Sequence, residues 1–352
     1  MNQLLLIIAG GAVFGVAANF LSYMGNPANT GVCVSCFLDN VAGAIGLHGV
    51  ERFSYLRPEI PGFVLGSFGA AFFSGGFSSR GGSNPAIRFL SGLFILVGCD
   101  VFIGCPIKLL LRLSNGGVGA LAGLAGMVAG IWLANRLIID GFELDPGKNR
   151  PDPAGMIMPA AALALLGFIA FRPGFIREAL SGPGAEHAPI AISLGAGLLA
   201  GAIAQKTRFC VTGSIRNHLL AGDRSLLFGT LAFFAAAMAT AAVTGQLRPD
   251  FHTEAGAHTD LFWSFLAMFM VGLGAILADG CPFRHLILSA EGSISSNWTI
   301  AGMLAGAVVS VGLGVHSTSF GPSPAGKIAV LTGIIFFLGI GLVKRKGSAE
   351  EV

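Results

Sequence analysis

The chain has 352 residues, of which 53% are hydrophobic and only 11% are charged, and 53 are glycine. This composition, with a mean hydropathy of +0.76, excludes an ordinary soluble enzyme and predicts an all-α polytopic membrane protein. The formal net charge of +3 is small and gives no reason to expect a nucleic-acid partner.

The N-terminal stretch, residues 1–24, reads MNQLLLIIAGGAVFGVAANFLSYM. It lacks the basic region of a signal peptide and is long enough to cross a hydrocarbon core about 30 Å thick, so we expect it to be retained as the first span. The most polar stretches, around 136–155 and 248–260, are too short to bury the core of a soluble domain. The function should therefore lie within the membrane domain.

Apolar runs predict about ten helices that cross the bilayer, with nine as an alternative. Their centres lie near residues 12, 68, 95, 126, 164, 197, 236, 270, 307 and 335. Between some of them are segments too short to cross, and each contains or begins with a cysteine: 31–47, 105–115, 208–220 and 281–291. Broken helices are tolerated at membrane depth only where they are buried or line a cavity, so these segments predict a path.

The four short segments are two copies of one pattern. TGVCVSCFLDN (30–40) aligns with TRFCVTGSIRN (207–217), and GCPIK, which contains Cys105, aligns with GCPFR, which contains Cys281. Both alignments need the same offset to within one residue. We therefore expect a single membrane domain made of a first repeat (1–172), a connector (173–188) and a second repeat (189–352).

Each repeat would hold about five spans and two short re-entrant helices. An odd number of spans places the second copy upside down, which is the inverted-repeat plan of many transporters and predicts an hourglass shape. Basic residues favour an orientation with both termini inside, and the strongest contribution comes from Lys344, Arg345 and Lys346 near the C-terminus. The C-terminus should therefore be cytoplasmic.

The repeated Gly-Cys-Pro triplet suits the start of a short helix. Proline has a fixed φ and no N–H to lose, so it fits the first helical position and leaves the cysteine at the cap. There the sulfur faces free N–H groups and the positive end of the helix dipole, where anions bind. A thiol in this position suits a soft, sulfur-like anion.

Several charged side chains could support such a site. Lys108 and Arg284 follow Cys105 and Cys281 by one helical turn and would add positive potential. Lys206 and Arg208 precede Cys210 and would make the cytoplasmic vestibule more basic, unless they are only solvated surface cations. Intramembrane acids are functional candidates, so Asp279 could couple protons, although it or Asp100 could simply pair with a nearby cation.

Other interpretations of the cysteines remain open. Free cysteine is often only a small buried hydrophobe, and Cys36 and Cys99 have no counterpart in the second repeat. The CVSC stretch could instead make Cys33 and Cys36 the redox pair of a membrane thiol oxidoreductase or sulfur carrier. A zinc site with the cysteines is not expected, because none of six histidines has ligand spacing to them: His48, His187, His218, His258, His285 and His316.

Five stretches together resemble the YeeE/YedE sulfur-transport family, in order and through nearly the whole chain. They are GNPANTGVCVSCFLDNVAGAIGLH, GCPIKLLLRL, SGPGAEHAPI, QKTRFCVTGSIRN and GCPFRHLILSAEG. The nearest resemblance is to the YedE-like branch, described as selenium transporters.

The resemblance implies a transporter of the bacterial inner membrane, without enzymatic activity or cofactor, that imports thiosulfate or a selenium analogue. It implies that Cys33, Cys105, Cys210 and Cys281 hand the anion along a central pore by S–H hydrogen bonds. A cysteine at position 36 resembles the YedE-like branch. The resemblance therefore leaves the substrate open among small sulfur or selenium species. A cytoplasmic sulfur- or selenium-handling protein is a further partner to expect.

Overall fold

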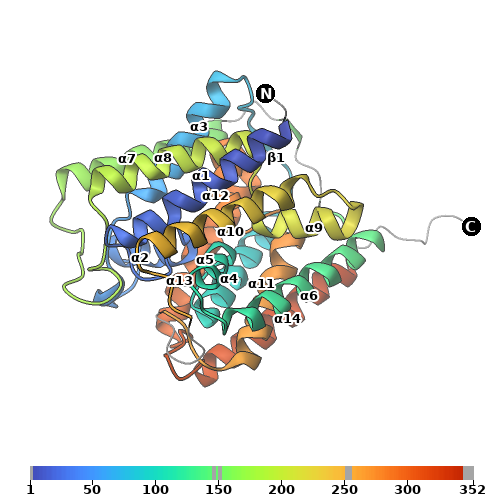
Figure 1. The fold of residues 1–352 in the computed structure, drawn as a ribbon. Helices are drawn as coiled ribbons and strands as arrows, with labels where there is room; N and C mark the ends of the chain where they lie inside the picture. Colours follow the sequence, from blue (N-terminus) through green and yellow to red (C-terminus); the bar gives the residue numbers. More distant parts are fainter. Residues whose placement is uncertain (1–2, 145–147, 150–152, 250–255, 344–352) are drawn as a thin grey trace, which may run out of the picture.

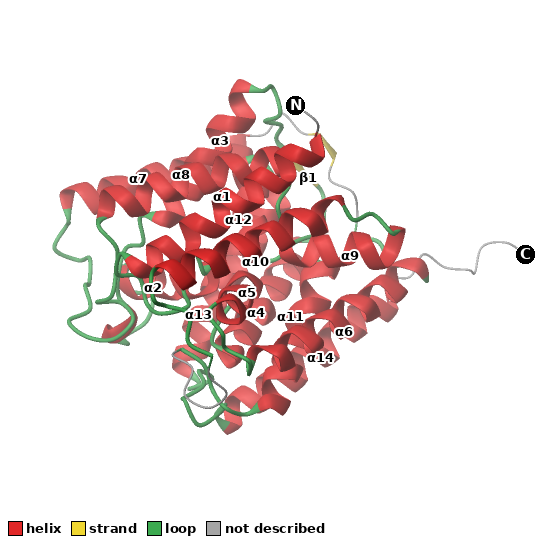
Figure 2. Ribbon diagram, viewed as in Figure 1, coloured by secondary structure: helices red, strands yellow, loops and turns green. Residues whose placement is uncertain are grey.

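The structure is a computed structural model that describes residues 3–144, 148–149, 153–249 and 256–343. Within these residues the chain is almost entirely helical, as Figure 2 shows. The helices are α1 (Gln3–Tyr23), α2 (Val34–Ala44), α3 (Glu59–Phe73), α4 (Pro85–Phe102), α5 (Pro106–Ser114), α6 (Ala120–Ile139), α7 (Ile157–Phe171), α8 (Ile190–Thr207), α9 (Val211–Ala221), α10 (Ser225–Val243), α11 (Leu261–Leu277), α12 (Pro282–Ala290), α13 (Ile294–Gly312) and α14 (Pro324–Val343).

Two short 3-10 helices and two short strands complete the described elements. The 3-10 helices are η1 (Glu51–Phe53) and η2 (Pro153–Met156). Strand β1 (Arg80–Gly81) pairs antiparallel with β2 (Lys148–Asn149), with Arg80 opposite Asn149.

Nine helical segments among the described residues are long and apolar enough to cross a membrane. The predicted all-α, multi-pass architecture is therefore confirmed. The run expected near residue 68 forms the shorter helix α3, of 15 residues. Its first residue, Glu59, is fully buried and accepts hydrogen bonds from Asn26 and Ser193, so α3 begins inside the protein.

The long helices form two packed groups. In the first group α10 packs on α1, α1 on α8, α8 on α3 and α3 on α7. In the second group α13 packs on α4, α4 on α11 and α11 on α6, while α14 covers α4 and α11. Figure 1 shows α1, α8 and α10 side by side in the upper part of the view and α6, α11 and α14 in the lower part.

Three of the short helices join these two groups. Helix α5 contacts α10 of the first group and α6 of the second, and α12 contacts α3 and α13 in the same way. Helix α9 lies against α10 and α6. Helix α2 lies against α13 and α4 of the second group and also contacts α12, while α5 contacts α9, so the four cysteine-bearing segments contact one another in pairs.

The order of elements from α1 to α7 recurs from α8 to α14. The contacts are reciprocal: α1 packs on α10 as α8 packs on α3, and α4 packs on α13 as α11 packs on α6. The last helices break this pattern, because α7 packs on α3 whereas α14 packs on α4 and α11. Segment 172–189 connects α7 to α8, close to the expected connector; the inverted relation, the re-entrant course and the repeat boundaries stay predictions. Lys344, Arg345 and Lys346 lie outside the described residues.

Glycines let the crossing helices approach until their backbones touch. A Cβ at Gly92 of α4 would overlap the carbonyl oxygen of Thr299 on α13, and one at Gly15 of α1 would overlap that of Phe233 on α10. Small residues at such crossings provide the close packing that holds helices together in lipid, where no hydrophobic force drives them together.

Replacement of Gly92 by alanine should therefore separate α4 from α13. Forcing one extra methyl group into a packed contact costs about 1–3 kcal/mol. We expect G92A to lower the thermal unfolding temperature of the detergent-purified protein. The matched control is G167A on α7, where an added Cβ meets nothing within 4 Å and alanine favours the helix. Equal melting temperatures for G92A and the unmodified protein would contradict the close crossing.

Candidate functional site

Four cysteines occupy the same structural position, the N-cap of a short helix. Cys33 caps α2, Cys105 caps α5, Cys210 caps α9 and Cys281 caps α12, each with extended backbone. Pro106 and Pro282 follow at the first helical positions, where a missing N–H costs nothing. The local structure expected from Gly-Cys-Pro is confirmed.

The first two caps come together. The backbone N–H of Cys105 donates to the sulfur of Cys33 at 3.4 Å, which joins the N-terminus of α5 to that of α2. The sulfur of Cys36, one turn into α2, lies 3.0 Å from the Cys33 sulfur. The hydroxyl of Ser35 is 3.4 Å from the Cys33 sulfur. Three cysteines from two different short segments of the first half therefore form one cluster, which we call the first thiol cluster.

The other two caps form a second thiol cluster. The sulfurs of Cys210 and Cys281 lie 3.8 Å apart, which joins α9 to α12. The Cys210 sulfur also accepts from the N–H of Gly213 at 3.3 Å and lies 3.3 Å from the hydroxyl of Thr212. Gly213 stands where the first cluster has Cys36, so the second cluster has two sulfurs instead of three.

Cys210 is alone among the four in making a side-chain cap hydrogen bond. In the described residues, no hydrogen bond links the first cluster to the second. Convergence of all four sulfurs on one central point therefore stays a prediction, and the structure brings them together in two pairs.

A cavity of about 540 Å³ opens beside the first thiol cluster. Cys36, Cys99 and Lys108 are among its lining residues, together with Asp39, Asp100 and His316. The Lys108 ammonium is 4.0 Å from the Cys36 sulfur, and its side chain is almost fully buried. Its stem lies against Gly104, where a Cβ would come within 2.6 Å of the lysine chain, so the glycine of Gly-Cys-Pro makes room for the cation.

The other expected supporting charges are placed differently. Arg284 lies 3.6 Å from a carboxylate oxygen of Glu291, which also pairs with Arg80, so one carboxylate is shared by two guanidinium groups and a net positive charge remains. Lys206 and Arg208 are exposed next to the second thiol cluster. Asp279 accepts a hydrogen bond from Arg88 at 2.8 Å. It therefore pairs with a nearby cation, which the sequence analysis gave as the alternative to proton coupling.

Asp39 and His316 line the cavity beside the first thiol cluster, which we call the vestibule from here on. The sequence reasoning did not single out these two residues. The Nε2 atom of His316 lies 3.9 Å from a carboxylate oxygen of Asp39 and 3.8 Å from one of Asp100. Burial acts to lower the pKa of His316, but these two carboxylates outweigh it and raise the pKa to about 9. The available signal was an acid within a short cysteine-bearing segment, as Asp39 is in α2.

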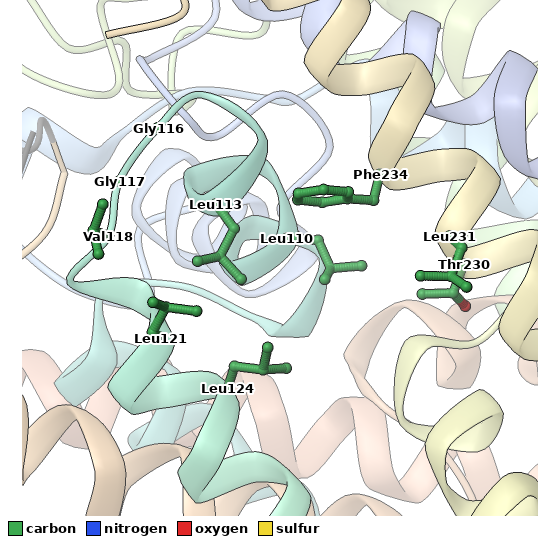
Figure 3. Close-up of a pocket in the computed structure, with 10 residues that line it drawn as sticks. All are labelled: Leu110, Leu113, Gly116, Gly117, Val118, Leu121, Leu124, Thr230, Leu231 and Phe234. Carbon is green, nitrogen blue, oxygen red and sulfur yellow. The ribbon is translucent and has the colours of Figure 1, made fainter. Parts of the chain in front are cut away.

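A separate pocket of about 420 Å³ lies between α5, α6 and α10 and is shown in Figure 3. Leucines line most of it, including Leu110, Leu113 and Leu124. Its one side-chain hydroxyl, that of Thr230, already donates to neighbours in the protein. This apolar surface offers nothing to a small anion, so the candidate site is the vestibule and the thiol clusters.

A family model described as sulphur transport matches residues 206–341. The matched region contains Cys210 and Cys281, and it supports the resemblance found in the sequence. The match covers less than half of the chain, which is similar to sulphur-transport proteins over these residues, and the apolar helices indicate a multi-pass membrane protein. No curated protein matched the chain.

The two thiol clusters can be tested by mild oxidation of the purified protein. Sulfurs only 3.0 and 3.8 Å apart need little movement to bond, so oxidation should join Cys33 to Cys36 and Cys210 to Cys281. Alkylation followed by peptide mass spectrometry would identify the linked pairs and should find Cys99 unlinked. Detection of Cys33 bonded to Cys210 as the main product would contradict the division into two clusters.

Proposed function

We propose that the protein imports a small sulfur or selenium species, a thiosulfate-like anion or its selenium analogue, across the bacterial inner membrane. The anion passes between the two helical layers, through a path whose narrow parts are lined by Cys33, Cys105, Cys210 and Cys281. The family match and the apolar helices support transport of sulfur; the substrate, the membrane and the direction are part of the proposal.

The observation that carries this proposal is the pairing of thiol-capped helix starts. Cys33, Cys105 and Cys281 make no side-chain cap hydrogen bond, so the N–H groups that begin α2, α5 and α12 face only a weak thiol acceptor. These weakly capped N–H groups and the helix dipoles favour an anion at each cluster. A thiol therefore caps its helix weakly and leaves the helix start able to bind a passing anion.

The thiols explain why a soft anion would be preferred. A thiol is a weak donor and a polarisable, weak acceptor, so it can replace part of the hydration shell of a sulfur-containing anion without holding it tightly. Conduction needs binding that is strong enough for entry and weak enough for release. At the vestibule, the buried ammonium of Lys108 beside Cys36 adds the positive potential that draws an anion in.

The second thiol cluster would serve as the cytoplasmic side of the path. Exposed Lys206 and Arg208 lie in the chain just before Cys210, where they would hold an anion near the exit. In the inverted-repeat arrangement the first cluster faces outward, the second faces inward, and the C-terminus is cytoplasmic. A cytoplasmic sulfur- or selenium-handling protein could receive the substrate at this face.

Flux into proteoliposomes of the pure protein tests the proposal. Thiosulfate should enter faster than into empty vesicles, and sulfate, which has no soft sulfur atom, should not; selenite and sulfite complete the panel. C105A and C281A should each reduce uptake about tenfold or more, because losing a hydrogen bond to a charged group costs about 1.5–3 kcal/mol. Alanine still permits the extended cap, so both variants should fold.

The matched control is S91A on α4, which also removes one buried side-chain atom. Ser91 is buried and its hydroxyl has no hydrogen-bond partner among the described residues, so its loss should leave both fold and uptake unchanged. Uptake at the unmodified rate by C105A and C281A would overturn the thiol-lined path. No flux of any of the four anions would overturn transport itself.

One observation favours a second candidate function. The sulfurs of Cys33 and Cys36 are 3.0 Å apart, which suits a redox pair that releases two electrons and two protons to an acceptor as the disulfide forms. A variant with all six cysteines replaced by serine separates the two functions. If it still takes up substrate but no longer transfers electrons, the oxidoreductase or sulfur-carrier function is correct and the thiol path is wrong.

A further inference from the structure

The vestibule contains a cluster of two acids and one imidazole, brought together from distant parts of the chain. Asp39 comes from α2, Asp100 from the last turn of α4, and His316 from the loop between α13 and α14. One potential ligand atom from each residue lies within 4.8 Å of the other two. The cluster borders the cavity of about 540 Å³ beside the first thiol cluster.

The imidazole is held in place from several directions. Phe53 stacks on its ring, with centroids 5.1 Å apart. The next residue, Ser317, donates a hydrogen bond to the carbonyl oxygen of Val101 at 2.6 Å, which fixes the loop against the end of α4 beside Asp100. The position of His316 is therefore set by packing outside the cluster, and a ligand would find it already oriented.

The cluster has unused polar atoms in a buried setting. Asp39 and Asp100 are only 6% and 5% exposed. Their atoms Oδ1 and Oδ2, respectively, and Nε2 of His316 are buried without a hydrogen-bond partner among the described residues. Buried polar atoms cost free energy unless they find a partner, and two adjacent carboxylates repel each other. A single imidazolium between them leaves one net negative charge.

We propose that Asp39, Asp100 and His316 bind a divalent first-row transition-metal cation. Two carboxylate oxygens and one imidazole nitrogen are ligands that Mn²⁺ and Zn²⁺ accept, and three protein ligands leave a further position open to the cavity. The cation takes the place of the imidazolium proton, which leaves to water, and its two charges balance the two carboxylates. The ligands include no cysteine, so this site differs from the zinc–thiolate site that the sequence argued against.

The distances are close to those that such an ion needs. Three ligands about 2.1 Å from a tetrahedral metal lie about 3.4 Å from one another. The distances from His316 Nε2 to the two carboxylate oxygens, 3.9 and 3.8 Å, are slightly longer than this, and the ligand atoms all lie within 4.8 Å of one another. Small rotations of the aspartate side chains toward the imidazole would bring all three atoms to one ion.

The second half of the chain has no counterpart of this cluster. In the alignment of the two halves, Asp39 corresponds to Arg216 and Asp100 to Ile276. The same local helix arrangement is therefore built in the second half without any acid at these positions. A role for the acids in holding the fold would apply to both halves, whereas a ligand site in one vestibule accounts for their presence in only one.

Binding of Mn²⁺ to the full-length, detergent-purified protein tests this assignment. Mn²⁺ is the probe because it prefers oxygen and nitrogen to the thiols nearby, and its free form is measured directly by electron paramagnetic resonance. The chelator-treated protein should bind one Mn²⁺ per chain and gain thermal stability. D39N, D100N and H316Q should each weaken binding at least about tenfold, because even indirect partners of a metal cost that much when removed.

The matched control is H218Q on α9, remote from the vestibule, which should bind Mn²⁺ as the unmodified protein does. Asparagine and glutamine keep the shape of the original side chains, and gel filtration checks that each variant is folded. If one variant does not fold, the other two decide. No bound Mn²⁺ at millimolar concentration, or unchanged affinity in the folded variants, would show that the three residues form only an internal ion cluster.

Discussion

The architecture depends on one constraint, which is that the N–H groups of helix starts placed inside the membrane domain must find partners within the protein or in a filled cavity. In hydrocarbon surroundings an unsatisfied backbone group costs several kcal/mol, so broken helices survive only where protein or a filled cavity surrounds them. The chain meets this constraint at α2, α5, α9 and α12 with cysteine, a residue that caps weakly. Serine or aspartate would satisfy the N–H groups better, and would therefore leave less for a passing anion.

Side chains around the two thiol clusters help to keep these helix starts in place. The buried guanidinium of Arg57 donates to Asn40 of α2 and to the carbonyl oxygen of Pro183 in the segment that joins α7 to α8. Phe37 and Tyr55 cover the same guanidinium, each about 5.0 Å from it. Around the second thiol cluster, the rings of Phe14 and Phe283 stack 5.1 Å apart and fill the space beside Cys281. Polar contacts and aromatic rings therefore both surround the first cluster, and aromatic rings also pack near the second.

The sequence predicted those features of the fold that depend on residues close together in the chain. Apolar runs located the long helices, and Gly-Cys-Pro located the starts of α5 and α12 because proline is favoured at the first helical position. The sequence did not reveal which caps would pair, since Cys33 meets Cys105 and Cys210 meets Cys281 only through packing of distant segments. Asp39, Asp100 and His316 show no spacing pattern for the same reason. The apolar run of α3 was predicted but its shortness was not, because its start is set by the burial of Glu59 and not by hydropathy.

The reciprocal packing of the long helices has a consequence for the assembly of the protein. Each layer mixes the two halves of the chain, with α1 and α3 beside α8 and α10, and α4 and α6 beside α11 and α13. A polypeptide containing only the first seven helices would leave bare the glycine-lined faces that now meet the second half. Neither half can therefore complete its packing without the other, and the two halves have to assemble together. The aligned positions can still differ between them, since Asp39 and Asp100 of the first half align with Arg216 and Ile276 of the second.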